Sequence, residues 1–401
     1  MPSVCLYFHV HQPYRINDFS VFNIGGEKPY FDETRNKFYL ERIARKCYLP
    51  TNALLLDLIK KYKGQFKISF SITGLILEQL EQDFPDVLES FKKLVKTGHA
   101  ELIGETYHHS LAFLYSQKEF KKQISLHKNK LQKIFNKAPV TFRNTELAFN
   151  NEMATAIEKM GYKTVLTEGA KQILGWRSPD FVYKAKDTKN LKVLMRNYQL
   201  SDDISFRFSC KEWGEWPLTA DKFTSWVNRV NGNGQVVNLF MDYETFGEHQ
   251  WEDTGIFQFL ENLPQEILKN KDNNFKTPSE ITKLYKPVGE IDCPNTISWA
   301  DTERDLSAWL GNQMQKEAAQ KIYSLENSVI LTKSKPLIDQ WRKLQTSDHF
   351  YYMCTKWFSD GDVHKYFNPY ESPYECFISY MNIVSDLQQK IENSYNKIKV
   401  A

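Results

Sequence analysis

The sequence of 401 residues has few cysteines and no long apolar run, and both absences narrow the class of protein. Its six cysteines are widely spaced and form no C-x-x-C pair, so neither a zinc knuckle nor a dense disulfide framework is indicated. No run of about 18 apolar residues occurs, which argues against a membrane-spanning helix. The chain enters a strand pattern almost at once, without a basic and then apolar leader. We therefore expect a reduced, cytoplasmic protein.

The sequence also has no large excess of charge of either sign. The net charge is only +3, so bulk electrostatics give no reason to expect nucleic acid or a membrane as a partner. Hydrophobic residues make up 41% and charged residues 25%, as in an ordinary globular protein. Aromatic residues are abundant at 14%, and a surplus of Trp and Tyr would suit stacking against sugar rings.

Strand and helix patterns alternate over the first two thirds of the chain. Strands are predicted at 4–10, 66–72, 100–103, 140–143, 164–166, 191–195, 204–208 and 236–241. Helical spacing lies between them at 33–62, 74–80, 85–98, 117–136, 153–160 and 220–230. This alternation predicts a parallel sheet with crossover helices, and its length fits a closed barrel. The last third is predicted to be a helical appendage, with helices at 301–325, 335–344 and 372–398.

Polar side chains repeatedly follow the predicted strands. They are His9 and His11, then Glu105 and His108, then Glu146, and finally Asp242 with Glu248 and His249. Because the carboxyl ends of parallel strands meet at one rim, we expect these groups to converge. Glu146 and Asp242 each follow a strand directly. A pair of carboxylates at a rim is what cleavage of a glycosidic bond requires.

Each of these groups also has a simpler explanation. Glu146 could be a favourable charge at a helix N-terminus, with Asn144 or Thr145 as the cap. Asp242 could likewise form a cap or an Asx-turn. His9 and His11 share one face of their strand, which suits either a metal with a further ligand or contact with a substrate.

Five segments, in order, resemble the characteristic motifs of glycoside hydrolase family 57, and in particular of its α-amylase-type members. They are HVHQPYR (9–15), GHAELIGETYHHS (98–110), FRNTELAFNN (142–151), MDYETFGEHQ (241–250) and RDLSAWLGN (304–312). The resemblance implies an α/β fold, namely an incomplete (β/α)7 barrel over residues 1–285. It also implies a C-terminal helical domain over residues 286–401 that contributes to the substrate cleft.

The resemblance further implies a retaining glycosidase that acts on α-1,4-glucans without a metal or other cofactor. Glu146 matches the nucleophile of the family, and Asp242 matches its general acid/base. Asp242 must then start protonated, so its pKa should be raised. The predicted substrate-binding residues are His9, His11, Gln12, Glu105, Trp213, Trp216, Glu248, His249, Trp251 and Trp309, of which Glu248 and His249 would support Asp242.

Several alternatives stay open. The same glycosyl-enzyme would serve a 4-α-glucanotransferase or a glucan branching enzyme. A non-catalytic α-glucan-binding protein is the alternative of another class, since the family includes members that lack catalytic residues. A metal-dependent mannosidase or polysaccharide deacetylase is more distant. The expected partner is an α-glucan or maltooligosaccharide, and the sequence leaves open whether the chain forms a homo-oligomer.

Overall fold

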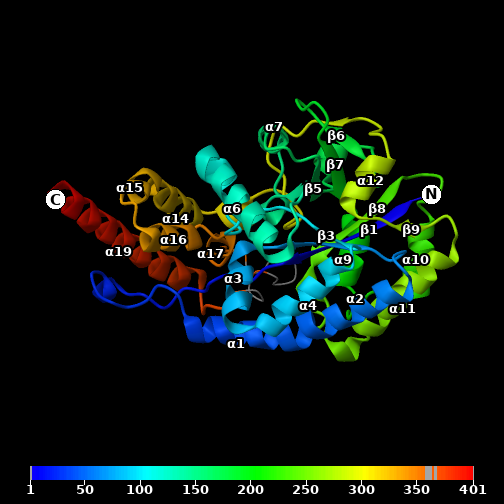
Figure 1. Ribbon diagram of the computed structural model, residues 1–401, viewed down its shortest axis with the longest axis horizontal. Coiled ribbons are helices and arrows are strands. Elements are labelled where there is room, and N and C mark those ends of the chain that lie inside the picture. Colours follow the sequence, from blue (N-terminus) through cyan, green and yellow to red (C-terminus); the bar gives the residue numbers. More distant parts are fainter. Residues whose placement is uncertain (1, 357–363, 365–367, 401) are drawn as a thin grey trace.

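Strand β1 (Ser3–Val10) lies inside the molecule and organises the architecture (Figure 1). The computed structural model describes residues 2–356, 364 and 368–400. Every residue of β1 is buried, as expected of a strand that is apolar on both faces. It pairs in parallel with β2 (Ile68–Ile72) on one side and with β8 (Val236–Asp242) on the other.

The described strands form two five-stranded sheets. The first has the order β3–β2–β1–β8, with β9 also paired to β1, and the second has the order β10–β6–β7–β5–β4. Among these pairs only β6 with β7 is antiparallel. The remaining strands are β3 (Ala100–Leu102), β4 (Thr141–Arg143), β5 (Thr164–Glu168), β6 (Tyr183–Ala185), β7 (Lys192–Arg196), β9 (Asn274–Phe275) and β10 (Glu290–Ile291).

The two sheets meet at two places. Gly104, just after β3, forms a parallel bridge with Phe142 of β4. At the other junction the backbone N–H of Asn197 donates to the carbonyl oxygen of Asn238 at 2.9 Å. The side-chain amide of Asn238 donates in turn to the carbonyl oxygen of Met195 at 2.8 Å. The parallel strands β8, β1, β2, β3, β4, β5 and β7 therefore lie next to one another in that order.

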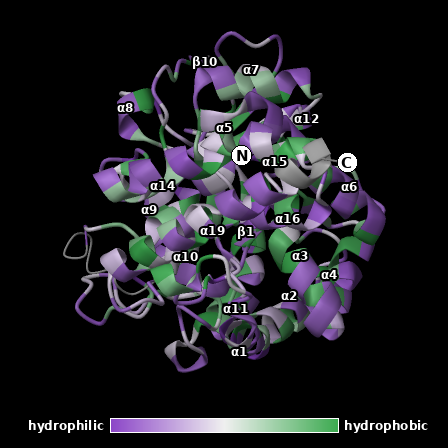
Figure 2. Ribbon diagram, turned by 90° about the vertical axis from the view of Figure 1, so that its left-hand side faces the viewer, coloured by the Kyte–Doolittle hydropathy of each residue, from purple (hydrophilic) through white to green (hydrophobic). Residues whose placement is uncertain are grey.

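Helices at the N-terminal end of the chain cover the first sheet, along the lower edge of Figure 1. They are α1 (Glu33–Ile43), the π-helical turn η2 (Ala44–Tyr48), α2 (Leu49–Lys61), α3 (Gly74–Asp83) and α4 (Pro85–Lys96). Helix α4 buries Val87, Phe91, Leu94 and Val95, which share one face at helical spacing. Figure 2 shows its ribbon changing between hydrophilic and hydrophobic residues, as an amphipathic helix on a core requires.

The middle of the chain supplies further crossover helices. Helix α6 begins where Ser116 accepts the N–H of Glu119 at 3.1 Å and ends at Asn136, which is left-handed (φ 54°). The described helices of this part are α5 (Ala112–Tyr115), α6 (Gln117–Phe135), α7 (Asn151–Lys159), α8 (Lys171–Leu174), α9 (Tyr198–Ser205), α10 (Ala220–Asn228), α11 (Ile256–Lys269) and α12 (Pro278–Leu284). Short 3₁₀ turns are η1 (Val21–Asn23), η3 (Thr145–Leu147), η4 (Tyr243–Thr245) and η5 (Glu252–Thr254).

The C-terminal part is helical, and α19 (Pro373–Val400), red in Figure 1, packs beside α14, α15 and α16. Trp341 is fully buried there, and its indole N–H donates to the carbonyl oxygen of Ile322 at 2.8 Å. One hydrophobic core joins these helices to β4 and α7. The helices before α19 are α13 (Ser307–Leu310), α14 (Gln313–Ser324), α15 (Glu326–Leu331), α16 (Lys335–Lys343) and α17 (Ser347–Tyr351).

Side-chain alternation along the strands separates two environments. In β1, Val4, Leu6, Phe8 and Val10 pack with the covering helices, whereas Cys5 and Tyr7 belong to a small apolar cluster with residues of β5, β7 and β8. Because successive residues point to opposite faces, the next residues on the inner face follow that cluster at the strand ends. They are polar or charged: His9, Glu105, Arg143, Glu168, Arg196 and Asp242.

Two sequence predictions are wrong in detail. Residues 204–208 were predicted as a strand, but Ile204 and Ser205 end helix α9, because Asn197 caps this helix through the N–H of Leu200. Residues 301–306 were predicted as helix, but they belong to a loop in which Asp301 and Arg304 both have positive φ. Within the part of the chain that the structure describes, no helix is long and apolar enough to cross a membrane.

Candidate active site

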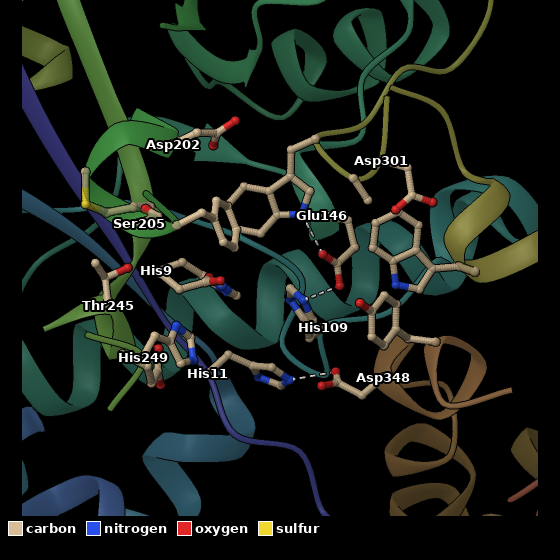
Figure 3. A pocket seen from close by; sticks show the side chains of 18 of the residues that line it. His9, His11, His109, Glu146, Asp202, Ser205, Thr245, His249, Asp301 and Asp348 are labelled. Atoms are coloured by element: carbon tan, nitrogen blue, oxygen red, sulfur yellow. Dashed lines mark hydrogen bonds and ion pairs between the residues drawn. The ribbon is translucent and has the colours of Figure 1, made fainter. Parts of the chain in front are cut away.

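A cavity of about 590 Å³ opens where the strand ends face the C-terminal helices (Figure 3). Seven of the predicted site residues line it: His9, His11, Gln12, Glu146, Asp242, His249 and Trp309. Their convergence follows from the register of β1 and β8, which places His9 beside Asp242. The two predicted catalytic carboxylates therefore share one cavity.

Glu146 is held in an unusual backbone conformation at the cavity wall. Its φ is 57° and ψ is 30°, a left-handed geometry that costs a non-glycine residue roughly 1–2 kcal/mol. Its carbonyl oxygen accepts hydrogen bonds from the Ser298 hydroxyl at 2.8 Å and from the Trp299 N–H at 3.4 Å. The loop that carries Ser298 and Trp299 thus fixes the direction of the Glu146 side chain.

Three donors surround the carboxylate of Glu146. His109 Nε2 lies 3.0 Å and Ser347 Oγ 2.8 Å from Oε1, and Trp299 Nε1 donates to Oε2 at 2.9 Å. Burial opposes ionisation, but the positive charge and hydrogen bond of His109 outweigh it and hold the pKa of Glu146 below its usual range. An ionised, directed carboxylate is what a nucleophile requires.

His109 is the cation that stabilises Glu146. Burial disfavours its charge, yet the ion pairs with Glu146 and Glu105 raise the pKa of His109 to about 9. Its φ of 50° is also left-handed. The sequence had singled out His108, which is buried elsewhere, where burial and the charge of Arg342 lower its pKa well below the usual value. The imidazole at the site is therefore that of His109.

Asp242 differs from the expectation for a proton donor. Its Oδ1 lies 3.3 Å from Nδ1 of His9, and its side chain is 39% exposed, more than that of Glu146. Burial raises the pKa of Asp242, but the hydrogen bond and charge of His9 together with the charges of His249 and Arg143 bring it below the ordinary value. The raised pKa predicted for Asp242 from the sequence is therefore wrong, because the sequence does not show which cations lie beside the carboxylate.

The raised pKa lies instead on Glu244, two residues beyond Asp242. Burial, and then the negative charge of Asp242, raise the pKa of Glu244 to about 8. Its Oε1 accepts from the hydroxyl of Tyr48 and from the Gln12 amide, the latter at 3.4 Å. Glu244 lines the cavity, so a neutral carboxyl and an ionised one stand side by side at the end of β8.

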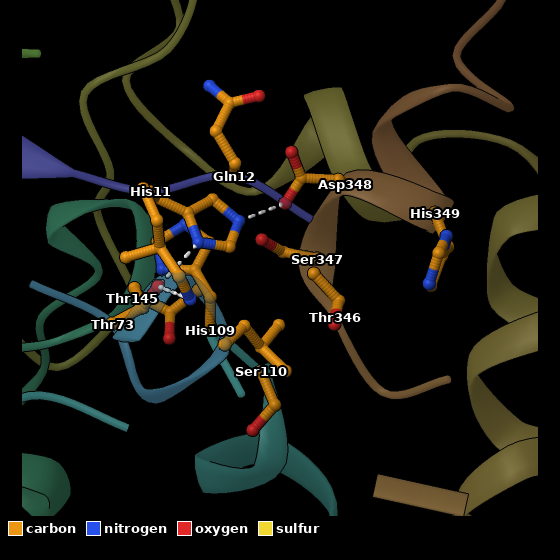
Figure 4. Close-up of polar contacts among 12 residues, drawn as sticks. His11, Gln12, Thr73, His109, Ser110, Thr145, Thr346, Ser347, Asp348 and His349 are labelled. Atoms are coloured by element: carbon orange, nitrogen blue, oxygen red, sulfur yellow. Dashed lines mark hydrogen bonds and ion pairs between the residues drawn. The ribbon is translucent and has the colours of Figure 1, made fainter. Parts of the chain in front are cut away.

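His11 ties the strand end to the C-terminal helices (Figure 4). Its Nδ1 lies 2.9 Å from the Thr73 hydroxyl, and its Nε2 lies 3.0 Å from Oδ2 of Asp348. Its ring packs against that of His109 at a centroid distance of 4.2 Å. Burial, and then the charge of His109, lower the pKa of His11 to about 4, so it is neutral near pH 7.

Two groups of residues have the donor spacing that a metal could use. They are His9, Glu105 and His109, and His11, His109 and Asp348, each with donor atoms within 4.8 Å of one another. In both groups histidine nitrogens already face carboxylates, and the guanidinium of Arg143 lies 3.8 Å from Glu105. The negative charge is therefore balanced without an added cation, and the absence of a metal stays a prediction.

Five predicted substrate-binding residues do not line the cavity. Glu105 is fully buried beneath it, and Glu248 is paired with Arg42. Trp213 packs against Trp226 at a centroid distance of 6.1 Å. Trp216 and Trp251 are 43% and 59% exposed outside the cavity. Abundant tryptophan therefore did not identify which rings face the site.

The structure adds cavity residues that the sequence analysis missed. Trp299 and Asp348 come from a loop and a short helix that carry no strand-end pattern, and Arg196 follows a correctly predicted strand. Trp299 lies between Arg143 and Arg196, whose guanidinium carbons are 5.1 and 5.9 Å from its ring centre. Only Arg196 carried a usable signal, because it ends β7 in the same way as Asp242 ends β8.

Comparisons with known proteins identify the family of this chain. Residues 5–294 match the family model of glycosyl hydrolase family 57. A Methanocaldococcus jannaschii protein described as "Putative alpha-amylase" is 45% identical over 399 residues, covering 96% of this chain and 84% of the relative. "Alpha-amylase 1" of Dictyoglomus thermophilum is 23% identical over 327 residues, covering 78% of this chain but 45% of that longer protein.

The fold is shared with a solved structure as well. The GH57-type branching enzyme from Pyrococcus horikoshii superposes with a TM-score of 0.72 at 16% identity, covering 99% of this chain and 91% of that one. The α/β fold of this chain is therefore shared with that structure. The chain belongs to glycosyl hydrolase family 57, as the five motifs predicted.

Proposed function

We propose that this enzyme is a retaining hydrolase of α-1,4-glucans, similar to α-amylases. The observation that carries the proposal is the convergence of Glu146 and Asp242 on one cavity in a chain of this family. The relatives described as α-amylases support the choice of substrate. The cavity is large enough for a sugar chain to make several polar contacts in it. The proposed binding residues are His11, Gln12, His249 and Trp309.

In the proposed mechanism Glu146 attacks the anomeric carbon and Asp242 protonates the leaving oxygen. A covalent glycosyl-enzyme forms on Glu146, and Asp242 then removes a proton from the water that hydrolyses it. The low pKa of Asp242 results from its hydrogen bond with His9 and the charges of its neighbours, while 39% of its side chain is exposed to solvent. A bound glucan would displace that solvent, and desolvation would shift the pKa of Asp242 upward, as a general acid requires.

The architecture that we propose for this activity has two parts. The strands β8, β1, β2, β3, β4, β5 and β7 would form an incomplete (β/α)7 barrel within residues 1–285, supported by the bridge between Gly104 and Phe142. Residues 286–401 would form a helical domain that completes the cleft. Trp299, Trp309 and Asp348 support this division, because they line the cavity from that side.

Transfer to a second sugar is the second candidate, favoured by the shared fold of the branching enzyme. The deciding experiment is incubation with a single maltooligosaccharide, with products resolved by size and linkage. We expect only shorter α-1,4-linked products. Longer or α-1,6-linked products would assign a transferase instead, and binding without any turnover would assign a glucan-binding protein.

The hydrogen bond from Trp299 to Glu146 leads to a further prediction. Trp299→Phe removes the donor to Oε2, so the ionised form of Glu146 is less favoured and its pKa rises. Because a hydrogen bond to a charged group contributes about 1.5–3 kcal/mol, we expect kcat/KM to fall roughly 10- to 100-fold. The acidic limb of the profile of kcat/KM against pH should move to higher pH.

Trp309→Phe is the matched control. Trp309 lines the same cavity, but among the described residues its Nε1 has no hydrogen-bond partner. This variant should leave the acidic limb in place, whatever it does to KM. An equal shift of that limb in both variants would show that Trp299 acts by packing alone.

A further inference from the structure

Glu105 occupies the centre of the polar layer beneath the cavity. It is fully buried and lies out of reach of a ligand in the cavity, although the sequence had suggested that it binds substrate. Its Oε2 lies 3.4 Å from Nε2 of His9 and 3.5 Å from Nδ1 of His109. Burying a carboxylate is costly, so a position of this kind requires compensating partners.

The second ring nitrogen of each histidine faces a predicted catalytic carboxylate. His9 presents Nδ1 to Asp242 at 3.3 Å, and His109 presents Nε2 to Glu146 at 3.0 Å. The two rings stack at a centroid distance of 4.8 Å and an angle of 29°. One buried carboxylate is thus connected, through one imidazole on each side, to both reacting groups.

We propose that Glu105 is a positioning residue that couples the protonation of Asp242 and Glu146 through His9 and His109. The inference rests on the proposed function, because it assigns Glu105 a role relative to those two carboxylates. The carboxylate of Glu105 faces the inward nitrogen of each ring at ion-pair distance, and its charge favours a proton there. The opposite nitrogen of each ring is thereby directed at the cavity.

This arrangement can supply a proton to the leaving oxygen even though the pKa of Asp242 is low. When His9 is protonated, its Nε2–H faces Glu105 at 3.4 Å, with Nη1 of Arg143 at the same distance from Nε2, and its Nδ1–H donates to ionised Asp242. Transfer of one proton from Nδ1 to Oδ1 gives neutral His9 and a protonated Asp242, with Nε2–H still facing Glu105. Asp242 then passes this proton to the leaving oxygen, and the water that opens the glycosyl-enzyme returns one proton to the His9–Asp242 pair.

Other charged groups face this network from each neighbouring element. Arg143 of β4 lies 3.8 Å from Glu105, and the backbone N–H of Glu105 donates to Nδ1 of His127 in α6 at 3.1 Å. His11 and Asp348 lie beside His109, while Glu244 and His249 lie beside Asp242. The positive charges of Arg143 and His109 together balance the negative charges of Glu105 and Glu146. The proton that moves in the reaction is therefore the one shared by His9 and Asp242.

Glu105→Gln should therefore weaken proton binding at His109. An opposite charge at this distance shifts a pKa by roughly one to three units, and its loss should lower the pKa of His109 by that amount. The loss of a nearby negative charge should also let Asp242 give up its proton at lower pH. We expect the alkaline limb of the kcat/KM profile on maltoheptaose to move down by roughly one to three pH units.

Two measurements test this on the full-length protein. The first is histidine titration by two-dimensional NMR of the ligand-free enzyme, with His9 and His109 assigned by single substitutions. The second is the pH profile of hydrolysis. Glu105→Asp keeps the charge at a greater distance and should give intermediate shifts, which decides the question even if Glu105→Gln does not fold.

Glu119→Gln is the matched control, because Glu119 is also buried and pairs with an arginine, Arg342, but lies away from the cavity. It should alter neither titration nor profile. Unchanged titration of His109 in a folded Glu105 variant would overturn the inference, as would equal shifts in Glu119→Gln. If the wild-type protein cleaves no glucan, the proposed function fails, while the NMR titration still decides whether Glu105 controls the two histidines.

Discussion

Glu146→Gln is expected to abolish hydrolysis of maltooligosaccharides, with kcat reduced by at least about a thousandfold. The amide cannot form the glycosyl-enzyme, and neither His109 nor Ser347 offers a nucleophile in its place, because both point their polar atoms at Glu146 itself. The rate is best measured by release of reducing ends from maltoheptaose, alongside thermal unfolding to verify the fold.

Glu152→Gln is a suitable control for this substitution. Glu152 is an exposed carboxylate on α7, the helix that follows Glu146, and it has only a long contact of 3.4 Å with Gln117. This variant should keep the activity of the parent enzyme. Wild-type rates in Glu146→Gln would remove Glu146 from the role of nucleophile and leave it as a residue that orders the loop of Trp299.

Asp242→Asn is expected to slow cleavage of maltooligosaccharides by roughly 10²- to 10⁴-fold, the usual contribution of general acid–base catalysis. The loss should depend on the leaving group. Fluoride needs no proton, so the first step with an α-maltosyl fluoride should stay fast in Asp242→Asn and slow in Glu146→Gln. A burst of fluoride release, measured with an ion-selective electrode, distinguishes these two outcomes.

The pH dependence gives the same prediction a second test. An asparagine cannot titrate, so the alkaline limb that depends on the His9–Asp242 pair should disappear with the variant. If Asp242→Asn kept a wild-type profile, the proton donor would have to be sought at Glu244, which has the raised pKa and lines the same cavity. Glu244→Gln would then be the variant to measure.

The sequence predicted the parts of the site that depend on strand periodicity. His9 and Asp242 lie on the inner face because two-residue alternation continues from Tyr7 and Phe240. The order of strand and helix also predicted parallel pairing, which the structure shows for β1 with both β2 and β8. Both are local rules that need no knowledge of distant contacts.

The parts that could not be predicted depend on backbone geometry and on distant packing. Glu146 and His109 both adopt a left-handed conformation that no pattern of neighbouring residues indicates. The direction of His109 rather than His108 toward the cavity follows from that geometry. Ser347, two hundred residues after Glu146, reaches the carboxylate only because its helix packs against the strand ends.

The three donors around Glu146 come from two regions of the chain with different relations to the family. His109 lies within residues 5–294, the segment that matches the family model, whereas Trp299 and Ser347 lie beyond it. The acidity of the proposed nucleophile is thus shared between a residue of the second motif, His109, and two residues outside all five motifs. Substitution in the C-terminal helices can retune the working pH of the enzyme while every motif stays intact.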